Sequence, residues 1–191
     1  MLDAARELFE STGYEATTVR MIAKAAGVSV GSVFTTFASK RDVLAQILHE
    51  KFEALHLELN QLAPQLRGST ADRLRSIFAI HYAYAAQRPG LFLAYVAASF
   101  EGAVGARMDV PAGGQRLWNV LHGCLQDGRS RGEVCDHVDL SLVTDLLVSA
   151  YIWTYRLIAH DRAGPEKLSN VMDRHIGLIA EGFTPRPSSA S

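Results

Sequence analysis

The chain has 191 residues, of which 48% are apolar and 20% charged, with 19 basic and 20 acidic side chains. This composition excludes an intrinsically disordered protein, because it supplies enough apolar surface for a sizeable core. The formal net charge of −1 argues, taken alone, against a nucleic-acid-binding domain, which is usually basic.

The two cysteines, Cys124 and Cys135, form neither a disulfide framework nor a zinc signature. We therefore expect reduced thiols in a cytoplasmic protein. There is no secretory signal pattern, and the longest apolar stretches, 91–100 and 146–155, are half as long as a membrane helix of ~20 residues. His122 and Cys124 would point to different faces of one helix, so we expect no metal and no cofactor.

Apolar residues recur at spacings of three and four, while alternating runs bounded by turns are nearly absent. The chain is therefore predicted to be all-α, with about nine helices. A first helix ends at Gly13, and the following helices are expected at about 19–26, 30–36, 40–63, 71–87, 91–100, 115–130, 140–161 and 165–182. Residues 101–114, with four glycines, are expected to form a loop.

Residues 17–37 carry the most informative pattern. Thr18 can cap one short helix, Gly27 falls where that helix must turn sharply, and Ser29 can cap the next helix. The residues expected to face inward are Val28, Val33 and Phe37. Two short helices joined by a glycine turn predict a helix-turn-helix at about 18–37, whose second helix enters the major groove of DNA.

Local charge agrees with this prediction. Residues 17–41 contain four basic side chains and no acidic one, whereas the rest of the chain has 15 basic and 20 acidic side chains. The net charge thus averages two different regions and does not exclude DNA binding. From the pattern alone, a helical hairpin with no DNA role remains the alternative.

The first 45 or so residues resemble the DNA-binding domain of the TetR family of bacterial transcriptional regulators. Helix caps, turn glycine and core positions match together: Leu2-Asp3-Ala4-Ala5, Leu8-Phe9, Gly13-Tyr14, Thr17-Thr18-Val19, Ile22-Ala23, Ala26-Gly27-Val28-Ser29, Gly31, Val33, Phe37 and Ser39-Lys40. The expected organisation is a DNA-binding domain over 1–45, a helical ligand-binding and dimerisation domain over 46–183, and a flexible tail over 184–191.

The resemblance implies a homodimer on a palindromic, double-stranded DNA operator. The second helix of the motif would supply the groove-facing residues, and the helix starts would supply caps or phosphate contacts. The set expected at DNA is Thr17, Thr18, Ser29, Val30, Gly31, Ser32, Phe34, Thr35, Thr36 and Lys40. Phe34 stands where the family commonly has Tyr, which removes a hydroxyl contact but allows an apolar contact with a thymine methyl.

The resemblance also implies a domain that binds a small molecule and pairs with its twin through the last two long helices. The helix at 140–161 is apolar on more than one face, as burial in both a core and an interface requires. The pocket candidates are polar or aromatic residues on apolar helices, namely His81, Tyr84, Phe92, Tyr95, Trp118, His122, Trp153 and Tyr155.

The predicted function is a repressor that a small, largely apolar effector releases from DNA. The alternative is an all-helical enzyme or carrier whose N-terminal hairpin only mimics the motif. No paired carboxylates, nucleophile elbow or phosphate loop is recognisable, so we expect no enzymatic activity. Because no apolar stretch is long enough to span a membrane, we also expect no membrane partner. An activator, or a regulator without a ligand, also fits the sequence.

Overall fold

The computed structural model describes residues 1–87, 90–91, 112–161 and 164–185, and within these ranges every regular element is a helix. These ranges hold eight α-helices and one short 3-10 helix. The prediction of an all-α chain is thereby confirmed. The helix expected at 91–100 lies almost entirely outside the described residues, as do residues 101–111 of the expected loop and most of the expected tail.

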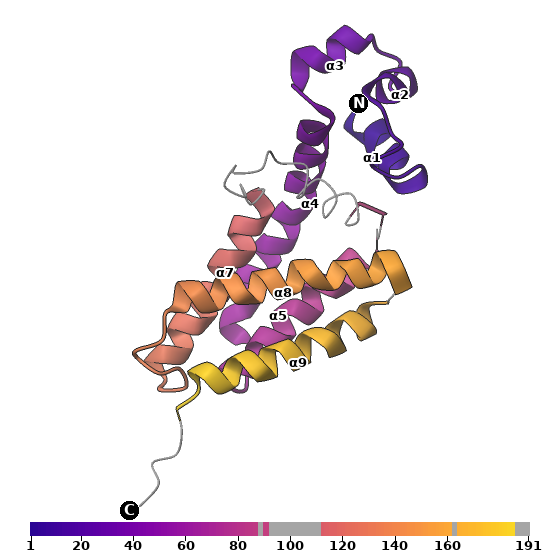
Figure 1. The fold of residues 1–191 in the computed structure, drawn as a ribbon. Helices are drawn as coiled ribbons and strands as arrows, with labels where there is room; N and C mark the ends of the chain where they lie inside the picture. The colour runs from indigo at the N-terminus through magenta and orange to yellow at the C-terminus, as the bar shows by residue number, and fades with distance from the viewer. Residues whose placement is uncertain (88–89, 92–111, 162–163, 186–191) are drawn as a thin grey trace, which may run out of the picture.

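Three short helices, α1 (Leu2–Ser11), α2 (Val19–Ala25) and α3 (Val30–Thr36), gather at one end of the molecule, with α3 at its outer tip (Figure 1). Each helix contributes to one small core because each has an apolar side. The buried side chains are Ala5, Phe9, Tyr14, Ile22, Ala23 and Val33.

The long helix α4 (Lys40–Leu62) leads from this group into the rest of the molecule. Its N-cap is Ser39, whose Oγ accepts a hydrogen bond from the N–H of Asp42. Helix α4 packs on both α1 and α7, so its buried residues belong to two groups of helices. Pro64 lies in the 3-10 turn Ala63–Gln65 that follows the helix.

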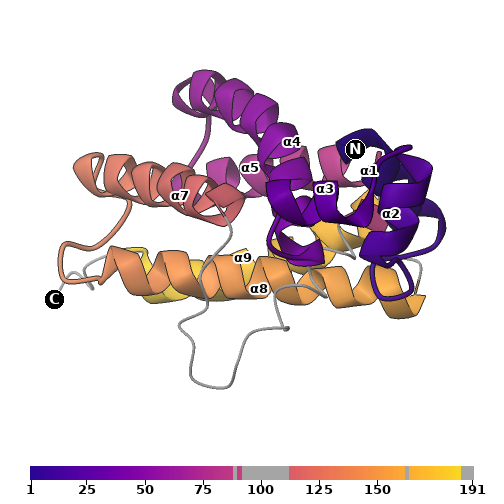
Figure 2. The same ribbon diagram turned by 90° about the horizontal axis from the view of Figure 1, so that it is seen from above.

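The larger group consists of α5 (Thr70–Ala85), α7 (Ala112–Ser130), α8 (Leu140–Asp161) and α9 (Pro165–Phe183). The helices α8 and α9 run side by side, α9 also packs on α5, and α7 contacts α8, α5 and α4 (Figures 1 and 2). This part of the core contains Leu74, Ile77, Phe78, Tyr82, Leu121, Leu125, Leu147, Met172 and Ile176.

The start of α7 differs from the expectation. The backbone is helical from Ala112, whereas Gly113 and Gly114 are predicted to lie in a loop. Glycine disfavours helix interiors through its backbone entropy, but two glycines in the first turn of a 19-residue helix do not outweigh the packing of the later turns.

Candidate nucleic-acid interface and effector site

The turn between α2 and α3 is closed by backbone hydrogen bonds. The N–H of Val28 donates to the carbonyl of Ala23 at 3.0 Å and the N–H of Gly27 to that of Lys24 at 3.3 Å, which is a Schellman motif. Gly27 has φ +66° and nothing within 4 Å of an added β-carbon. The position therefore favours glycine for its backbone conformation and not for lack of space.

Both short helices have the predicted caps. Thr18 Oγ1 accepts a hydrogen bond from the N–H of Met21 at 3.2 Å, and Ser29 Oγ accepts one from the N–H of Ser32 at 3.0 Å. These bonds satisfy amide groups that the first turn leaves without an intrahelical partner. Capping residues next to a glycine turn therefore determine where α3 begins.

The outer surface of α3 is exposed over most of its length. Val33 is buried against the core, whereas Phe34 is 53% exposed. The other exposed residues of the helix are Val30, Gly31, Ser32, Thr35 and Thr36. A short helix held by one buried valine thus presents the remaining side chains to solvent.

Thr17 does not support the expected DNA contact. Its side chain is 1% exposed, and its Oγ1 donates to the carbonyl oxygen of Gly13 at 2.7 Å. The carbonyl of Leu8 lies 3.3 Å from the same hydroxyl. The residue fastens the segment before α2 to the end of α1, and it has no free surface to offer DNA.

Lys40 also differs from the expectation of a phosphate contact. Its Nζ donates to the carbonyl oxygen of Tyr14 at 2.7 Å and lies 4.1 Å from the centroid of the Tyr14 ring. The charge therefore stabilises the contact between α4 and the turn that follows α1. The exposed cations of α2 are Arg20 and Lys24.

Val28 is predicted to face inward but is 38% exposed. It directly follows the glycine turn, where the hydrogen bonds of its backbone and not apolar packing hold it in place. Phe37, by contrast, is partly buried and packs against the core as expected.

A buried polar cluster lies among α4, α5 and α8, and it contains one of the expected effector residues. His81 Nδ1 is 3.1 Å from the hydroxyl of Tyr151, and the His56 ring centroid is 5.5 Å from that of His81. The Tyr82 hydroxyl lies 2.6 Å from Thr154 Oγ1. Burial, and secondarily the neighbouring His56, lower the pKa of His81 to about 3, so the ring is neutral at physiological pH.

Two other expected effector residues meet at the contact of α7 with α8. The Trp118 and His122 rings are stacked with centroids 4.5 Å apart. Trp118 Nε1 donates to the carboxylate of Asp145 at 2.8 Å, and His122 Nδ1 lies 3.4 Å from Thr144 Oγ1. His122 and Trp118 are therefore neighbours, as their spacing of four residues on one helix favours.

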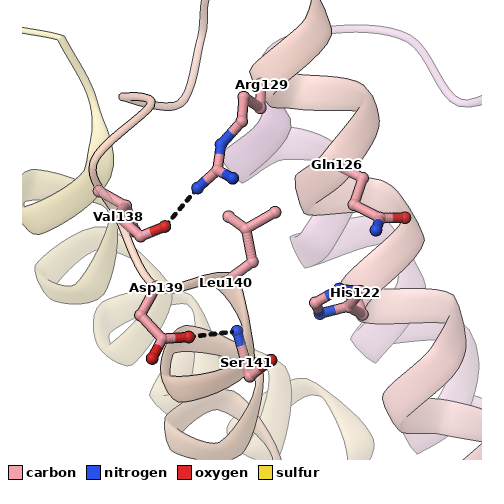
Figure 3. Close-up of a pocket in the computed structure, with 7 residues that line it drawn as sticks. All are labelled: His122, Gln126, Arg129, Val138, Asp139, Leu140 and Ser141. Carbon is pink, nitrogen blue, oxygen red and sulfur yellow. Dashed lines mark hydrogen bonds between the residues drawn. The ribbon is translucent and has the colours of Figure 1, made fainter.

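His122 also lines a pocket of about 480 Å³ between the end of α7 and the start of α8 (Figure 3). The guanidinium of Arg129 donates to the carbonyl of Val138, and the carboxylate of Asp139 accepts from the N–H of Ser141 at 2.9 Å. The complete lining is His122, Gln126, Arg129, Val138, Asp139, Leu140 and Ser141. This lining is largely polar, unlike the apolar effector pocket expected from the sequence.

Another expected effector residue, Tyr84, lies on α5. Tyr84 is partly buried and packs against the core. Phe92 and Tyr95 lie outside the described residues, and so does the side chain of Tyr155. Within the described part of the chain, no group of three His, Cys, Asp or Glu side chains could hold a metal ion.

Residues 1–47 match the family described as "Bacterial regulatory proteins, tetR family". The resemblance of the N-terminal residues to the TetR family is thereby confirmed. The fatty acid metabolism regulator protein of Bacillus subtilis (strain 168) is 24% identical over 147 residues, which cover 77% of this chain and 75% of that protein. Both the family description and the name of this relative are those of regulatory proteins.

Solved structures show the same fold over nearly the whole chain. FadR from Bacillus subtilis, in complex with stearoyl-CoA, has a TM-score of 0.74 at 22% identity and covers 95% of this chain and 96% of its own. FadR from Thermus thermophilus, a repressor in complex with lauroyl-CoA, has a TM-score of 0.77 at 24% identity and covers 100% of this chain and 96% of its own.

The chain exposes apolar side chains along α8 and α9. Trp153, expected in the pocket, is instead 50% exposed, with its ring centroid 5.8 Å from that of His175 on α9. The expectation was wrong because Trp153 lies on the outward face of a helix whose inward face is already filled by other residues. The exposed apolar residues of the two helices are Leu142, Leu146, Trp153 and Leu178.

Sequence reasoning missed four members of the buried polar cluster as candidate effector residues: His56, Tyr82, Tyr151 and Thr154. The available signal was a polar group within an apolar helical stripe, which each of them is. Their proximity could not be read from the chain, because it depends on how three helices pack. Among all the residues that the structure describes, no helix is long and apolar enough to cross a membrane.

Proposed function

We propose that this chain is a TetR-family repressor that binds a palindromic operator as a homodimer and leaves it when an effector binds. The observation that carries the proposal is the capped α2–α3 unit, which presents an exposed helix at the outer tip of the molecule. Such a helix fits the major groove, and two copies would read half-sites about one helical turn apart. A regulator of this kind works in the cytoplasm, where the DNA is.

The proposed DNA contacts follow from exposure. Groove-facing positions are Val30, Gly31, Ser32, Phe34, Thr35 and Thr36, with Thr18 and Ser29 at the helix starts. Thr17 is left out because it is buried, and Lys40 because it is engaged with Tyr14. The exposed Arg20 and Lys24 are the proposed phosphate contacts of the motif.

The proposed dimer interface is the outward face of α8 and α9. Four large apolar side chains on these two helices are each exposed by about half or more. Exposed apolar patches of this kind mark interaction surfaces. Replacing Leu178, which is 70% exposed, by Glu should give a monomer in light scattering that binds the operator poorly. The matched control, Leu57→Glu, changes an exposed leucine on α4 and should remain dimeric.

We propose that the functional division lies within α4, with 1–45 acting on DNA, 46–183 binding the effector and pairing the protomers, and 184–191 as a tail. Helix α4 packs on both α1 and α7, so we expect a shift in the larger part to move the DNA-binding part. A second contact supports this route, because a β-carbon at Gly90 would lie 3.1 Å from Cα of Glu10 in α1.

We propose a fatty acyl-CoA as the effector class, because two FadR structures with the same fold hold stearoyl-CoA and lauroyl-CoA. The buried cluster of His81, His56 and Tyr151 is the proposed polar end of the effector site, in an otherwise apolar helical core. For repression to be relieved, the acyl-CoA must bind better to the protein off DNA than to the protein on DNA.

The test begins with footprinting of the purified protein on DNA flanking its own gene, followed by titration of the protected fragment. Lauroyl-CoA and stearoyl-CoA should weaken operator binding, while coenzyme A without an acyl chain should not. Phe34→Asp places a negative charge at the exposed centre of α3 and should abolish specific binding, whereas Leu57→Asp should not. If no fragment is bound specifically at moderate salt, the proposal is wrong.

A further inference from the structure

The exposed surface of α3 has one apolar flank. Val30 and Phe34 are four residues apart, so their side chains lie on the same side of the helix, and both are exposed. Phe34 is the most exposed large apolar residue in the described part of residues 1–47. A solvent-exposed phenylalanine on a seven-residue helix contributes little to folding, so its surface is available to a partner.

The hydroxyl groups of α3 are engaged within the helix. Thr35 Oγ1 donates to the carbonyl of Gly31 at 2.9 Å, and Thr36 Oγ1 donates to that of Ser32 at 3.2 Å. Ser32 Oγ lies 2.8 Å from Ser29 Oγ. Both threonine hydroxyls therefore donate within the helix, and one of the two serine hydroxyls donates to the other.

The sequence of this helix also lacks the side chains that read bases by paired hydrogen bonds. Residues 25–39 contain no Arg, Lys, Asn, Gln, Asp or Glu. Those residue types make the bidentate contacts with guanine and adenine and the contact with the cytosine amino group. In the major groove, the apolar group that distinguishes one base from the others is the C5-methyl of thymine.

Gly31 adds an independent observation. Its φ is not in the left-handed region, and a β-carbon there would meet only Ser29 Oγ, at an ordinary 3.7 Å. Neither backbone conformation nor internal packing therefore calls for glycine at this exposed position. The missing side chain lowers the surface beside Val30 and Phe34, which lets the helix approach another surface closely.

We infer that Val30 and Phe34 determine operator specificity by packing against the C5-methyl groups of thymines, and that each half-site carries thymine opposite this flank. The inference rests on the proposed DNA binding and deepens it. It also specifies the chemistry of the operator, because the half-site is read through methyl groups more than through hydrogen bonds.

The experiment replaces thymine by deoxyuridine in the footprinted operator, one position at a time. Deoxyuridine keeps every hydrogen-bonding group of thymine and lacks only the methyl. Each thymine read by this flank should bind about fourfold more weakly after the replacement, as expected for burial of one methyl-sized group. Replacements outside the half-sites are the control and should leave affinity unchanged.

Variants then assign each methyl to its side chain. In Phe34→Ala, the deoxyuridine penalty should disappear at the thymine that Phe34 contacts and persist at the one that Val30 contacts, with the reverse in Val30→Ala. Leu57→Ala should keep both penalties. If the unmodified protein binds thymine and fully deoxyuridine-substituted operators equally well, this inference is overturned while the proposed function stands. If it binds no DNA specifically, both are overturned.

Discussion

Thr70 of α5 and Gly128 of α7 lie in direct contact, so close that a β-carbon added at Gly128 would overlap Thr70 Oγ1. Thr70 cannot readily move aside, because its Oγ1 and its N–H both donate to the carboxylate of Glu133, at 2.7 and 2.6 Å. These bonds from Thr70 hold the pKa of Glu133 below its usual range. The buried guanidinium of Arg73 completes the junction, 2.9 Å from the carboxylate of Asp127.

Replacing Gly128 by Ala should therefore lower the free energy of unfolding by about 1–3 kcal/mol, the usual cost of overpacking. The matched control lies in the same helix, since a β-carbon at Gly123 meets nothing within 4 Å. Gly123→Ala should raise stability by about 0.5–1 kcal/mol through helix propensity. Urea denaturation of both variants measures the difference, and equal effects would contradict the packing argument.

Because of the buried cluster, we expect the stability of the protein to fall at mildly acidic pH. The pKa of His81 is lowered to about 3 in the folded protein, whereas an unfolded histidine titrates near 6.5. Between these values the unfolded chain binds one more proton at this site, so stability is complete above about pH 6.5 and falls as the pH drops toward 3.

His81→Gln keeps a polar partner for Tyr151 without a titrating ring, so it should reduce the slope of stability against pH by about one proton in this range. His137→Gln is the control, because His137 is exposed, and its slope should match that of the unmodified protein. Denaturant midpoints between pH 4 and 7 provide the measurement. An unchanged slope in His81→Gln would show that another group is responsible.

Alanine substitutions at Gly27 and Gly31, two residues before and after Ser29, should have opposite effects on stability and on operator binding. Gly27 has a positive φ, so Gly27→Ala should destabilise the protein by about 1–2 kcal/mol although space is available. Gly31→Ala should leave thermal stability unchanged or slightly higher and yet weaken operator binding, because its role is toward DNA. Melting temperature and operator affinity, measured on both variants, separate the two effects.

Replacing Lys40 should affect mainly stability, whereas replacing Lys24 should affect mainly the salt dependence of operator binding. Lys40→Ala removes the contacts with Tyr14 and should cost about 1 kcal/mol of stability with little change in the salt dependence of binding. Lys24→Ala should leave stability unchanged and reduce the slope of log affinity against log salt by about one for each protomer. A loss of salt dependence in Lys40→Ala would show that its ammonium group turns to a phosphate on the operator.

Local chemistry explains which parts of the structure could be predicted. The bounds of α3 are predicted at Val30 and Thr36, as observed, because a cap at Ser29 and a glycine turn act within a few residues. The start of α8 follows equally from Asp139, whose carboxylate accepts from the N–H of Ser141 and of Leu142. Such signals depend only on neighbours in the chain.

The errors concern contacts between distant segments. Thr17 carries the same hydroxyl as Thr18, yet one is buried against α1 and the other exposed, and nothing local distinguishes them. Trp153 and Tyr151 are both aromatic residues of α8, and only the packing of α5 and α9 decides which of them is buried. The meeting of His56 with His81 likewise depends on the crossing of two helices.

The 23 residues of α4 form a rod of about 35 Å, given a rise of 1.5 Å per residue. The C-terminal end of α4, the far end, belongs to the larger group of helices, and its N-terminal end, the near end, carries the small group that includes α3. Tilting such a rod by about 5° about its far end moves the near end by about 3 Å, roughly the 3.4 Å spacing of successive base pairs. A rearrangement no larger than a change of side-chain packing could thus move α3 out of register by a whole base-pair step.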